Sequence, residues 1–200
     1  MVDTKLYEYM EEMLRKTPVA FQRYIFDTIP WSSQMVGITG ARGIGKSTMI
    51  RQYIIHNREK GNFLYVSADH TYFVDHSLTD LADEFVKDGG THLYIDEVHK
   101  YNGWAHELKQ IYDVHSDLNV VFTGSSILDI EDGEADLSRR ALMYNMSGLS
   151  FREYLNLFHG FNVRPYSLQD ILSHKARIDG IEHPLPFFRD YIRNGYYPFS

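Results

Sequence analysis

One short stretch of the chain combines three glycines with a lysine and a serine: residues 40–47 read GARGIGKS. Glycines let the backbone turn so that successive N–H groups point into one concavity, which suits an anion. Lys46 adds a full positive charge, and the hydroxyl of Ser47 is an oxygen ligand that a hard dication prefers. The stretch matches the phosphate-binding loop pattern and predicts a site for the phosphates of a nucleotide.

Within this loop we assign each polar side chain a task. The ammonium of Lys46 is expected to reach the β- and γ-phosphate oxygens of ATP, and Ser47 to ligate the Mg²⁺ that bridges them. Thr48 adds a contact near the α-phosphate. The predicted nucleotide-binding residues are Gly40, Ala41, Arg42, Gly43, Ile44, Gly45, Lys46, Ser47 and Thr48. The alternative is a glycine-rich turn with an incidental lysine.

A second candidate segment is an apolar run that ends in two carboxylates, HLYIDE at residues 92–97. In an α/β sheet the ligand lies at the carboxyl ends of the strands, so these carboxylates should emerge beside the loop. Asp96 is expected to hold Mg²⁺ together with Ser47. Glu97 is the candidate base that polarises a water aimed at the γ-phosphate. Taken alone, such a pair is also typical of a solvated turn.

Two further groups of polar residues could reach the same site. Residues 123–126 read TGSS after an apolar run, and we take Ser125 as the hydroxyl that contacts the attacking water or the γ-phosphate. The alternative is a turn that caps a helix. Arg139 and Arg140 precede the last expected strand, and one guanidinium, Arg140 by preference, could stabilise charge in the transition state. Ordinary surface arginines are the alternative.

These residues need a frame of alternating strands and helices. Apolar runs predict strands at 35–39, 62–66, 92–95, 118–123 and 141–146, and helical stripes predict helices at 47–57, 77–87 and 104–114. This order is typical of a three-layer α/β P-loop NTPase with a five-stranded, mostly parallel sheet. The length between Lys46 and Asp96 leaves room for an extra strand between the two motifs in the sheet.

The chain is expected to contain a nucleotide-binding domain at 1–148 and a small helical extension at 149–200, the start of a C-terminal domain. Residues 1–30 should form two helices: one with an apolar stripe from Leu6 to Leu14, and one with Thr17 as N-cap that ends at Pro30. In the extension, Ser150 and Glu153 have the spacing of a capping box, and helices are expected at 167–172 and 185–193.

Composition narrows the class of protein. The 200 residues carry a formal charge of -7, which gives no global basic surface for nucleic acid or anionic membrane, so the macromolecular partner stays open. Absence of cysteine excludes disulfides and thiolate metal sites, agrees with a reducing cytosol, and leads us to expect a cytoplasmic protein. No apolar stretch is long enough to span a bilayer. The sequence His106-Glu107 lacks a second histidine at position 110, so the zinc-protease pattern fails.

Taken in order, the motifs resemble those of prokaryotic AAA+ ATPases in which a C-terminal domain of unknown function follows the ATPase domain. The matching stretches are residues 38–48, 93–100, 121–126 and 150–155. The resemblance implies an AAA+ core, action on ATP, and a sensor role for the hydroxyl segment. It places Arg140 in register with an arginine before the last strand, although Arg139 stands where a glycine is usual. Ala41 and Ile44 replace a proline and a basic residue, and neither change removes a phosphate ligand.

The resemblance also implies a homo-oligomer, because AAA+ proteins usually work as assemblies. Whether Arg140 acts in its own subunit or in a neighbour stays open. The leading hypothesis is a Mg²⁺-dependent ATP hydrolase that couples its cycle to the C-terminal region or to a partner. The alternatives are a nucleotide-dependent switch or scaffold with little turnover, and a kinase for a small acceptor. Lack of an arginine-rich lid ranks the kinase last.

Overall fold

The computed structural model describes residues 1–125, 137–178 and 180–198. The chain forms two compact units, Met1–Met146 and Ser147–Ser200, and each is considered by itself. Ser126 of the hydroxyl segment lies outside the described residues. Among the described residues, no helix combines the length and the apolar composition needed to cross a bilayer.

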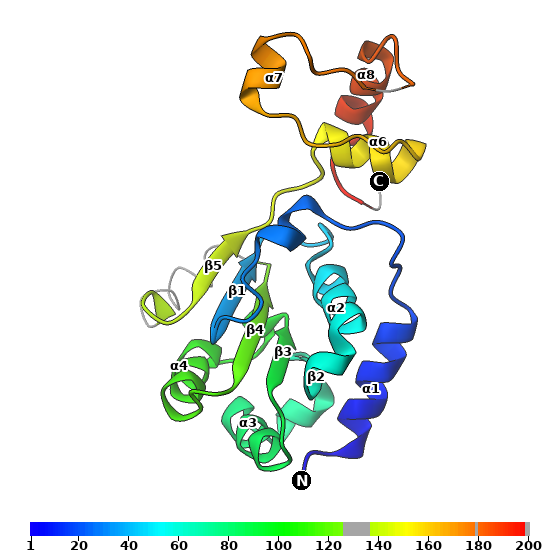
Figure 1. The fold of residues 1–200 in the computed structure, drawn as a ribbon. Helices are drawn as coiled ribbons and strands as arrows, with labels where there is room; N and C mark the ends of the chain where they lie inside the picture. Colours follow the sequence, from blue (N-terminus) through cyan, green and yellow to red (C-terminus); the bar gives the residue numbers. More distant parts are fainter. Residues whose placement is uncertain (126–136, 179, 199–200) are drawn as a thin grey trace. The chain divides into compact units, whose positions relative to one another are not determined.

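The first unit is built on a five-stranded sheet with the strand order β2-β3-β4-β1-β5 (Figure 1). The strands are β1 (Met35–Thr39), β2 (Phe63–Ser67), β3 (His92–Asp96), β4 (Asn119–Gly124) and β5 (Leu142–Asn145). All four strand pairs are parallel. β4 lies between β1 and β3, as the spacing of the two motifs predicted. The α/β P-loop NTPase fold is therefore confirmed, and all carboxyl ends of the strands meet at one edge.

Helices cover both faces of this sheet (Figure 1). They are α1 (Thr4–Arg15), α2 (Lys46–Asn57), α3 (Leu78–Lys87) and α4 (Trp104–Val114), with the 3-10 turns η1 (Tyr24–Thr28), η2 (Arg58–Lys60), η3 (Thr71–Val74) and η4 (Val98–Lys100). Leu93 and Ile95 of β3 belong to the core beneath α3 and α4. Tyr94, between them, faces the other way and lies 6.3 Å from the ring of Tyr53 in α2. This alternation shows a strand buried on both faces.

The described residues of the second unit form the short helices α6 (Phe151–His159), α7 (Leu168–Leu172) and α8 (Leu185–Asn194). The predicted capping box is present: the Ser150 hydroxyl accepts from the backbone N–H of Glu153, and the Glu153 carboxylate accepts from the backbone N–H of Ser150. Helices α6 and α8 meet through aromatic rings, with Phe151 5.2 Å from Phe188. The Tyr191 hydroxyl donates to the carbonyl of Leu149 at 2.6 Å. These contacts give the unit its own packing.

The helix predicted from Thr17 to Pro30 is wrong. Only the 3-10 turn η1 is helical in this segment. The hydroxyl of Thr17 donates to the carbonyl of Met13, so it completes the end of α1 and caps no second helix. The Gln52 amide of α2 donates to the carbonyls of Pro18 and Phe21 at 2.7 and 2.8 Å. Because a tertiary contact takes these carbonyls, the segment lies extended on α2.

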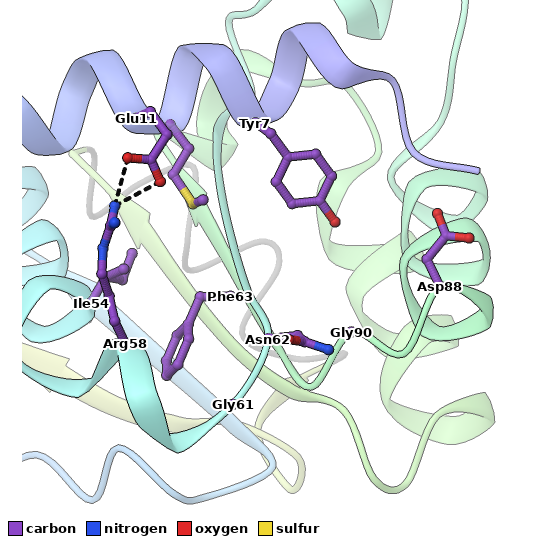
Figure 2. A pocket seen from close by; sticks show the side chains of 10 residues that line it. Tyr7, Glu11, Ile54, Arg58, Gly61, Asn62, Phe63, Asp88 and Gly90 are labelled. Atoms are coloured by element: carbon purple, nitrogen blue, oxygen red, sulfur yellow. Dashed lines mark hydrogen bonds and ion pairs between the residues drawn. The ribbon is translucent and has the colours of Figure 1, made fainter.

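Helix α1 is part of the core of the first unit. Its apolar stripe, Leu6, Met10 and Leu14, is buried. On its polar side Glu11 accepts two hydrogen bonds from the Arg58 guanidinium, at 2.7 and 2.8 Å (Figure 2). Both groups are about half exposed, so this pair adds little stability. Burial of the apolar stripe is therefore what holds α1 in place.

We predict that Leu6→Ala lowers the free energy of unfolding by about 2 to 5 kcal/mol, because the side chain is fully buried and its loss leaves a cavity. Urea denaturation followed by circular dichroism measures the change. Glu8→Ala, an exposed position on the same helix, is the control and should change stability by less than about 0.5 kcal/mol. Equal, small effects of both substitutions would show that α1 is not docked in solution.

Candidate functional site

The glycine-rich loop joins β1 to α2 at the carboxyl edge of the sheet. Gly40 has φ 141°, and a Cβ there would lie 2.3 Å from the backbone oxygen of Met146, so no other residue fits. Gly45 is the N-cap of α2 with φ 100°. The loop backbone is thus bent around the start of α2, where unpaired N–H groups and the helix dipole favour an anion.

Lys46 is the first residue of α2 and is 7% exposed. Its ammonium donates to the carbonyls of Gly40 and Ala41 at 2.7 and 2.9 Å, so it closes the loop on itself. Burial lowers the pKa of the Lys46 ammonium, whereas the charges of Asp96 and Glu97 oppose that shift. The cation therefore lies among acceptors that hold it at the mouth of the loop.

Asp96 is the last residue of β3 and is 5% exposed. One carboxylate oxygen accepts from the hydroxyl of Tyr65 at 2.7 Å, and the other accepts from the hydroxyl of Thr123. Tyr65 belongs to β2 and Thr123 to β4, the two neighbours of β3 in the sheet. Hydrogen bonds from both sides satisfy a carboxylate that burial would otherwise penalise.

Glu97 follows β3 in the left-handed region, with φ 54°. This conformation is uncommon for a residue with a side chain and persists where its surroundings enforce it. Its backbone N–H donates to the Thr123 hydroxyl at 3.0 Å. Thr123 therefore bonds to both acidic residues, and the turn directs the half-buried Glu97 side chain into the cavity beside the loop.

The loop and the acidic pair enclose one cavity of about 200 Å³. Its lining residues are Arg42, Gly43, Gly45, Lys46, Ser47, Thr48, Arg51, Asp96 and Glu97. The remaining predicted loop residues lie behind it: Gly40 and Ala41 bind Lys46, and Ile44 is buried with its side chain in the core. Among the lining residues, Ser47 and Asp96 offer a hydroxyl and carboxylate oxygens, the donor set that Mg²⁺ prefers.

Ser125 lies just beyond β4, as predicted, but its neighbour is a histidine. The Ser125 hydroxyl is 2.8 Å from Nε2 of His99, a half-buried residue of η4. His99 is thus bound to the hydroxyl segment, whereas Lys100, the next residue, is exposed. The hydroxyl that contacts the acidic pair belongs to Thr123. The sequence pattern did not distinguish these two side chains, and the role of Ser125 stays a prediction.

The structure does not bring Arg140 to the loop of its own chain. Arg140 precedes β5, and β5 runs parallel to β1, so Arg140 lies near the start of these strands while the loop follows the end of β1. A five-residue strand separates the two positions by about 16 Å. The guanidinium of Arg140 donates to Asp113, at the end of α4, at 2.8 and 3.0 Å. Arg139 is exposed.

Two basic residues of the site were not predicted. Arg51 lines the cavity one helical turn after Ser47, and its Nε donates to the Ser47 carbonyl at 3.1 Å. Arg23, 5% exposed, donates to the carbonyl of Ile44 in the loop at 2.6 Å. The spacing of Arg51 on α2 could have revealed it, because positions four apart share a helix face. Arg23 approaches from a segment whose path the sequence did not show.

A second cavity, of about 340 Å³, lies at the opposite end of β2 (Figure 2). Its walls include Tyr7 and Glu11 of α1, Arg58, and Phe63 at the start of β2. Its charged groups already have partners: the carboxylate of Glu11 binds the guanidinium of Arg58, and the carboxylate of Asp88 accepts from the backbone N–H of Val2 at 2.7 Å. The described lining offers no lysine, hydroxyl and carboxylate together. The smaller cavity at the loop combines a lysine, hydroxyls and carboxylates in its lining.

Comparison with known families adds an independent finding. Residues 32–155 match a family described as AAA domain. An uncharacterized protein from Methanocaldococcus jannaschii is 27% identical over 195 residues, covering 84% of this chain. The chain spans 41% of that relative's length. The matched range begins after η1 and ends within α6.

Solved structures similar to this chain include AMPPCP-bound DnaA from Aquifex aeolicus, with 14% identity, a TM-score of 0.49, and coverage of 97% of this chain and 62% of that one. The Hsp104–ADP complex of S. cerevisiae has 15% identity, a TM-score of 0.47, and coverage of 82% and 26%. Domain III of DnaA from Thermotoga maritima has 15% identity, a TM-score of 0.43, and coverage of 79% and 72%.

Because Arg23 binds a loop carbonyl from a buried position, we predict that Arg23→Met lowers the free energy of unfolding by about 1 to 3 kcal/mol. It should also speed amide hydrogen exchange in residues 43–47, measured by mass spectrometry. Arg139→Met makes the same change at an exposed position and is the control. Unchanged exchange in the loop of Arg23→Met would mean that Arg23 does not support it.

Proposed function

The chain belongs to the AAA domain family, and on this premise we propose that it is a Mg²⁺-dependent ATP hydrolase. One observation carries the proposal: a single cavity holds a lysine and a serine at a helix N-terminus opposite two carboxylates at a strand end. Lys46 and Ser47 come from the loop, and Asp96 and Glu97 from the end of β3. A nucleoside triphosphate with its bound Mg²⁺ needs both a cation for the phosphates and oxygen ligands for the metal.

For binding, the N–H groups of the loop and of the first turn of α2 would receive the phosphate oxygens. The ammonium of Lys46 would exchange the carbonyls of Gly40 and Ala41 for the β- and γ-phosphates, a small movement for a flexible side chain. Ser47 and Asp96 would hold Mg²⁺, which when bound neutralises phosphate charge. We propose ATP and ADP as the nucleotides.

For hydrolysis, Glu97 is the proposed general base. Its carboxylate would accept a proton from a water molecule whose oxygen forms a bond to the γ-phosphorus. The bond from that phosphorus to the bridging oxygen breaks, which yields ADP and inorganic phosphate. Ser125 is the proposed contact to the γ-phosphate or to the water, with His99 holding its hydroxyl in place.

We propose that this cycle is coupled to the region after residue 146, and the contacts of Met146 support the proposal. The backbone N–H of Met146 donates to the carbonyl of Thr39 at 2.8 Å, directly before the loop. Its carbonyl oxygen packs on Gly40. Met146 is also the last residue of the first unit. We propose that movement of the loop on nucleotide exchange passes through Met146 to the C-terminal region.

Three substitutions test the division of roles. Lys46→Ala should abolish nucleotide binding, measured by calorimetry, while thermal unfolding shows an intact fold. Glu97→Gln should retain ATP binding and lower the steady-state rate of phosphate release by about 100-fold or more, because an amide cannot take the proton. Asp96→Asn should raise the Mg²⁺ concentration needed for turnover. Each variant is compared with the wild type at the same Mg²⁺ concentration.

Different results would redirect the proposal. Wild-type affinity in Lys46→Ala would remove the loop from the nucleotide site. Loss of binding in both acidic variants would contradict separate roles for Asp96 and Glu97. Wild-type protein that binds ATP without releasing phosphate would favour a nucleotide-dependent switch or scaffold over a hydrolase.

Arg140 calls for a separate proposal because it lies far from the loop of its own chain. The Arg140–Asp113 ion pair lies at the surface, with the Asp113 side chain 46% exposed. A second copy of the chain could therefore receive this guanidinium at its γ-phosphate. We propose that Arg140 acts on the site of a neighbouring subunit in a homo-oligomer.

An arginine that stabilises only the transition state affects turnover more than binding, so Arg140→Ala should lower the rate of phosphate release at near-normal ATP affinity. The specific activity of the wild type should rise with protein concentration, and excess Glu97→Gln protein should partly rescue Arg140→Ala. Arg139→Ala is the control. If neither Arg140→Ala nor Arg139→Ala changes turnover, both arginines are ordinary surface residues.

A further inference from the structure

The hydroxyl of Tyr65 has a defined target in the site. Tyr65 is 2% exposed and lies in the middle of β2, in register with Tyr94 of β3, while Ser67 is in register with Asp96. The Tyr65 ring extends along the sheet, and its hydroxyl donates to Asp96 at 2.7 Å. Because a tyrosine hydroxyl carries its proton at neutral pH and a carboxylate is only an acceptor, Tyr65 is the donor in this hydrogen bond.

This hydrogen bond restricts how Asp96 can present its oxygens. A carboxylate has about four lone-pair positions. Thr123 takes one of them on the first oxygen and Tyr65 takes one on the second, so each oxygen keeps a free position in a set direction. Residues that orient a metal-binding carboxylate in this way typically change metal affinity when they are altered.

Helix α1 contacts the same tyrosine. The ring of Tyr9 stacks on the ring of Tyr65, with centroids 6.3 Å apart and an interplanar angle of 7°. Arg51 lies over the Tyr65 ring at 5.8 Å, and its guanidinium contacts the sulfur of Met13 at 3.7 Å. Two residues of α1 therefore adjoin the groups beside Asp96. Helix α1 precedes the range matched to the AAA domain family.

We propose that Tyr65 is a positioning residue for Asp96 and that α1, through Tyr9, holds Tyr65 in place. The nucleotide site then depends on a helix that lies outside the family's matched range. This inference rests on the proposed function, since it assigns Asp96 to the dication. On this inference Tyr65 controls the affinity for Mg²⁺ and does not affect the phosphate contacts of Lys46.

The test titrates Mg²⁺ while the binding of ADP is measured by calorimetry, and repeats ADP binding in EDTA. Tyr65→Phe removes only the hydroxyl and should raise the half-saturating Mg²⁺ concentration by about 10-fold, with ADP affinity in EDTA unchanged. The matched control is Tyr94→Phe. Tyr94 is a buried tyrosine of β3 that lies in register with Tyr65. Within the described part of the chain, its hydroxyl has no hydrogen-bond partner.

A second pair of variants tests the role of α1 without touching Asp96's donors. Tyr9→Leu removes the stacked ring and should shift the Mg²⁺ requirement in the same direction by a smaller factor. Tyr7→Leu makes the same change two residues away, at the cavity shown in Figure 2, and should leave the requirement unchanged. Thermal unfolding sets a temperature at which every variant is folded. If Tyr65→Phe does not fold, the difference in Mg²⁺ requirement between Tyr9→Leu and Tyr7→Leu tests the proposal.

The outcomes separate the two proposals. A Mg²⁺ requirement that Tyr65→Phe and Tyr9→Leu leave at the wild-type value would overturn the positioning role while the proposed function stands. A shift of equal size in Tyr94→Phe would also overturn it, because loss of any buried hydroxyl would then suffice. Wild-type protein whose ADP binding does not respond to Mg²⁺ would overturn both proposals.

Discussion

Burial of a carboxylate is the constraint on which the arrangement of the site depends. Removal of an ion from water costs several kcal/mol unless hydrogen bonds and opposite charge compensate it. Asp96 is almost fully buried, and the compensation comes from Tyr65 of β2, Thr123 of β4 and the nearby ammonium of Lys46. Three strands and the loop must therefore be in register before this residue is tolerable. The same requirement leaves the carboxylate oriented before any ligand binds.

The parallel sheet makes that register possible. Because every strand points the same way, the ends of β1, β3 and β4 deliver the loop, the acidic pair and the hydroxyl segment to one edge. The strand β4 between β1 and β3 adds a position for Thr123, whose hydroxyl bonds to Asp96 and to the backbone of Glu97. The same rule places Arg140 at the opposite edge, since it precedes its strand. Direction along a strand thus separates the groups that meet at the loop from Arg140, which does not reach the loop of its own chain.

Sequence patterns predicted most elements whose causes are local. Apolar periodicity located the helix Trp104–Val114 without error, and the capping box at Ser150 begins its helix as its spacing indicates. The prediction of a helix from Thr17 to Pro30 was wrong because Gln52, distant in sequence, binds carbonyls of this segment. The contacts of Tyr65 and Arg23 with the site likewise join residues distant in sequence. No local pattern encodes which partner such a side chain finds.

Several of these distant contacts join the first 31 residues to the site or to the helix that follows the loop. Arg23 supports the loop through Ile44, Gln52 of α2 fixes the extended segment, and Tyr9 packs on the tyrosine that binds Asp96. The matched family range begins at residue 32, after all of the N-terminal contributors. The motifs supply the groups proposed to meet the nucleotide, while residues of the preceding segment contact the loop backbone and the tyrosine that binds Asp96. Under the proposed function, affinity for phosphate and affinity for the dication would respond to different parts of the chain, because Arg23 supports the loop whereas Tyr65 and Tyr9 support Asp96.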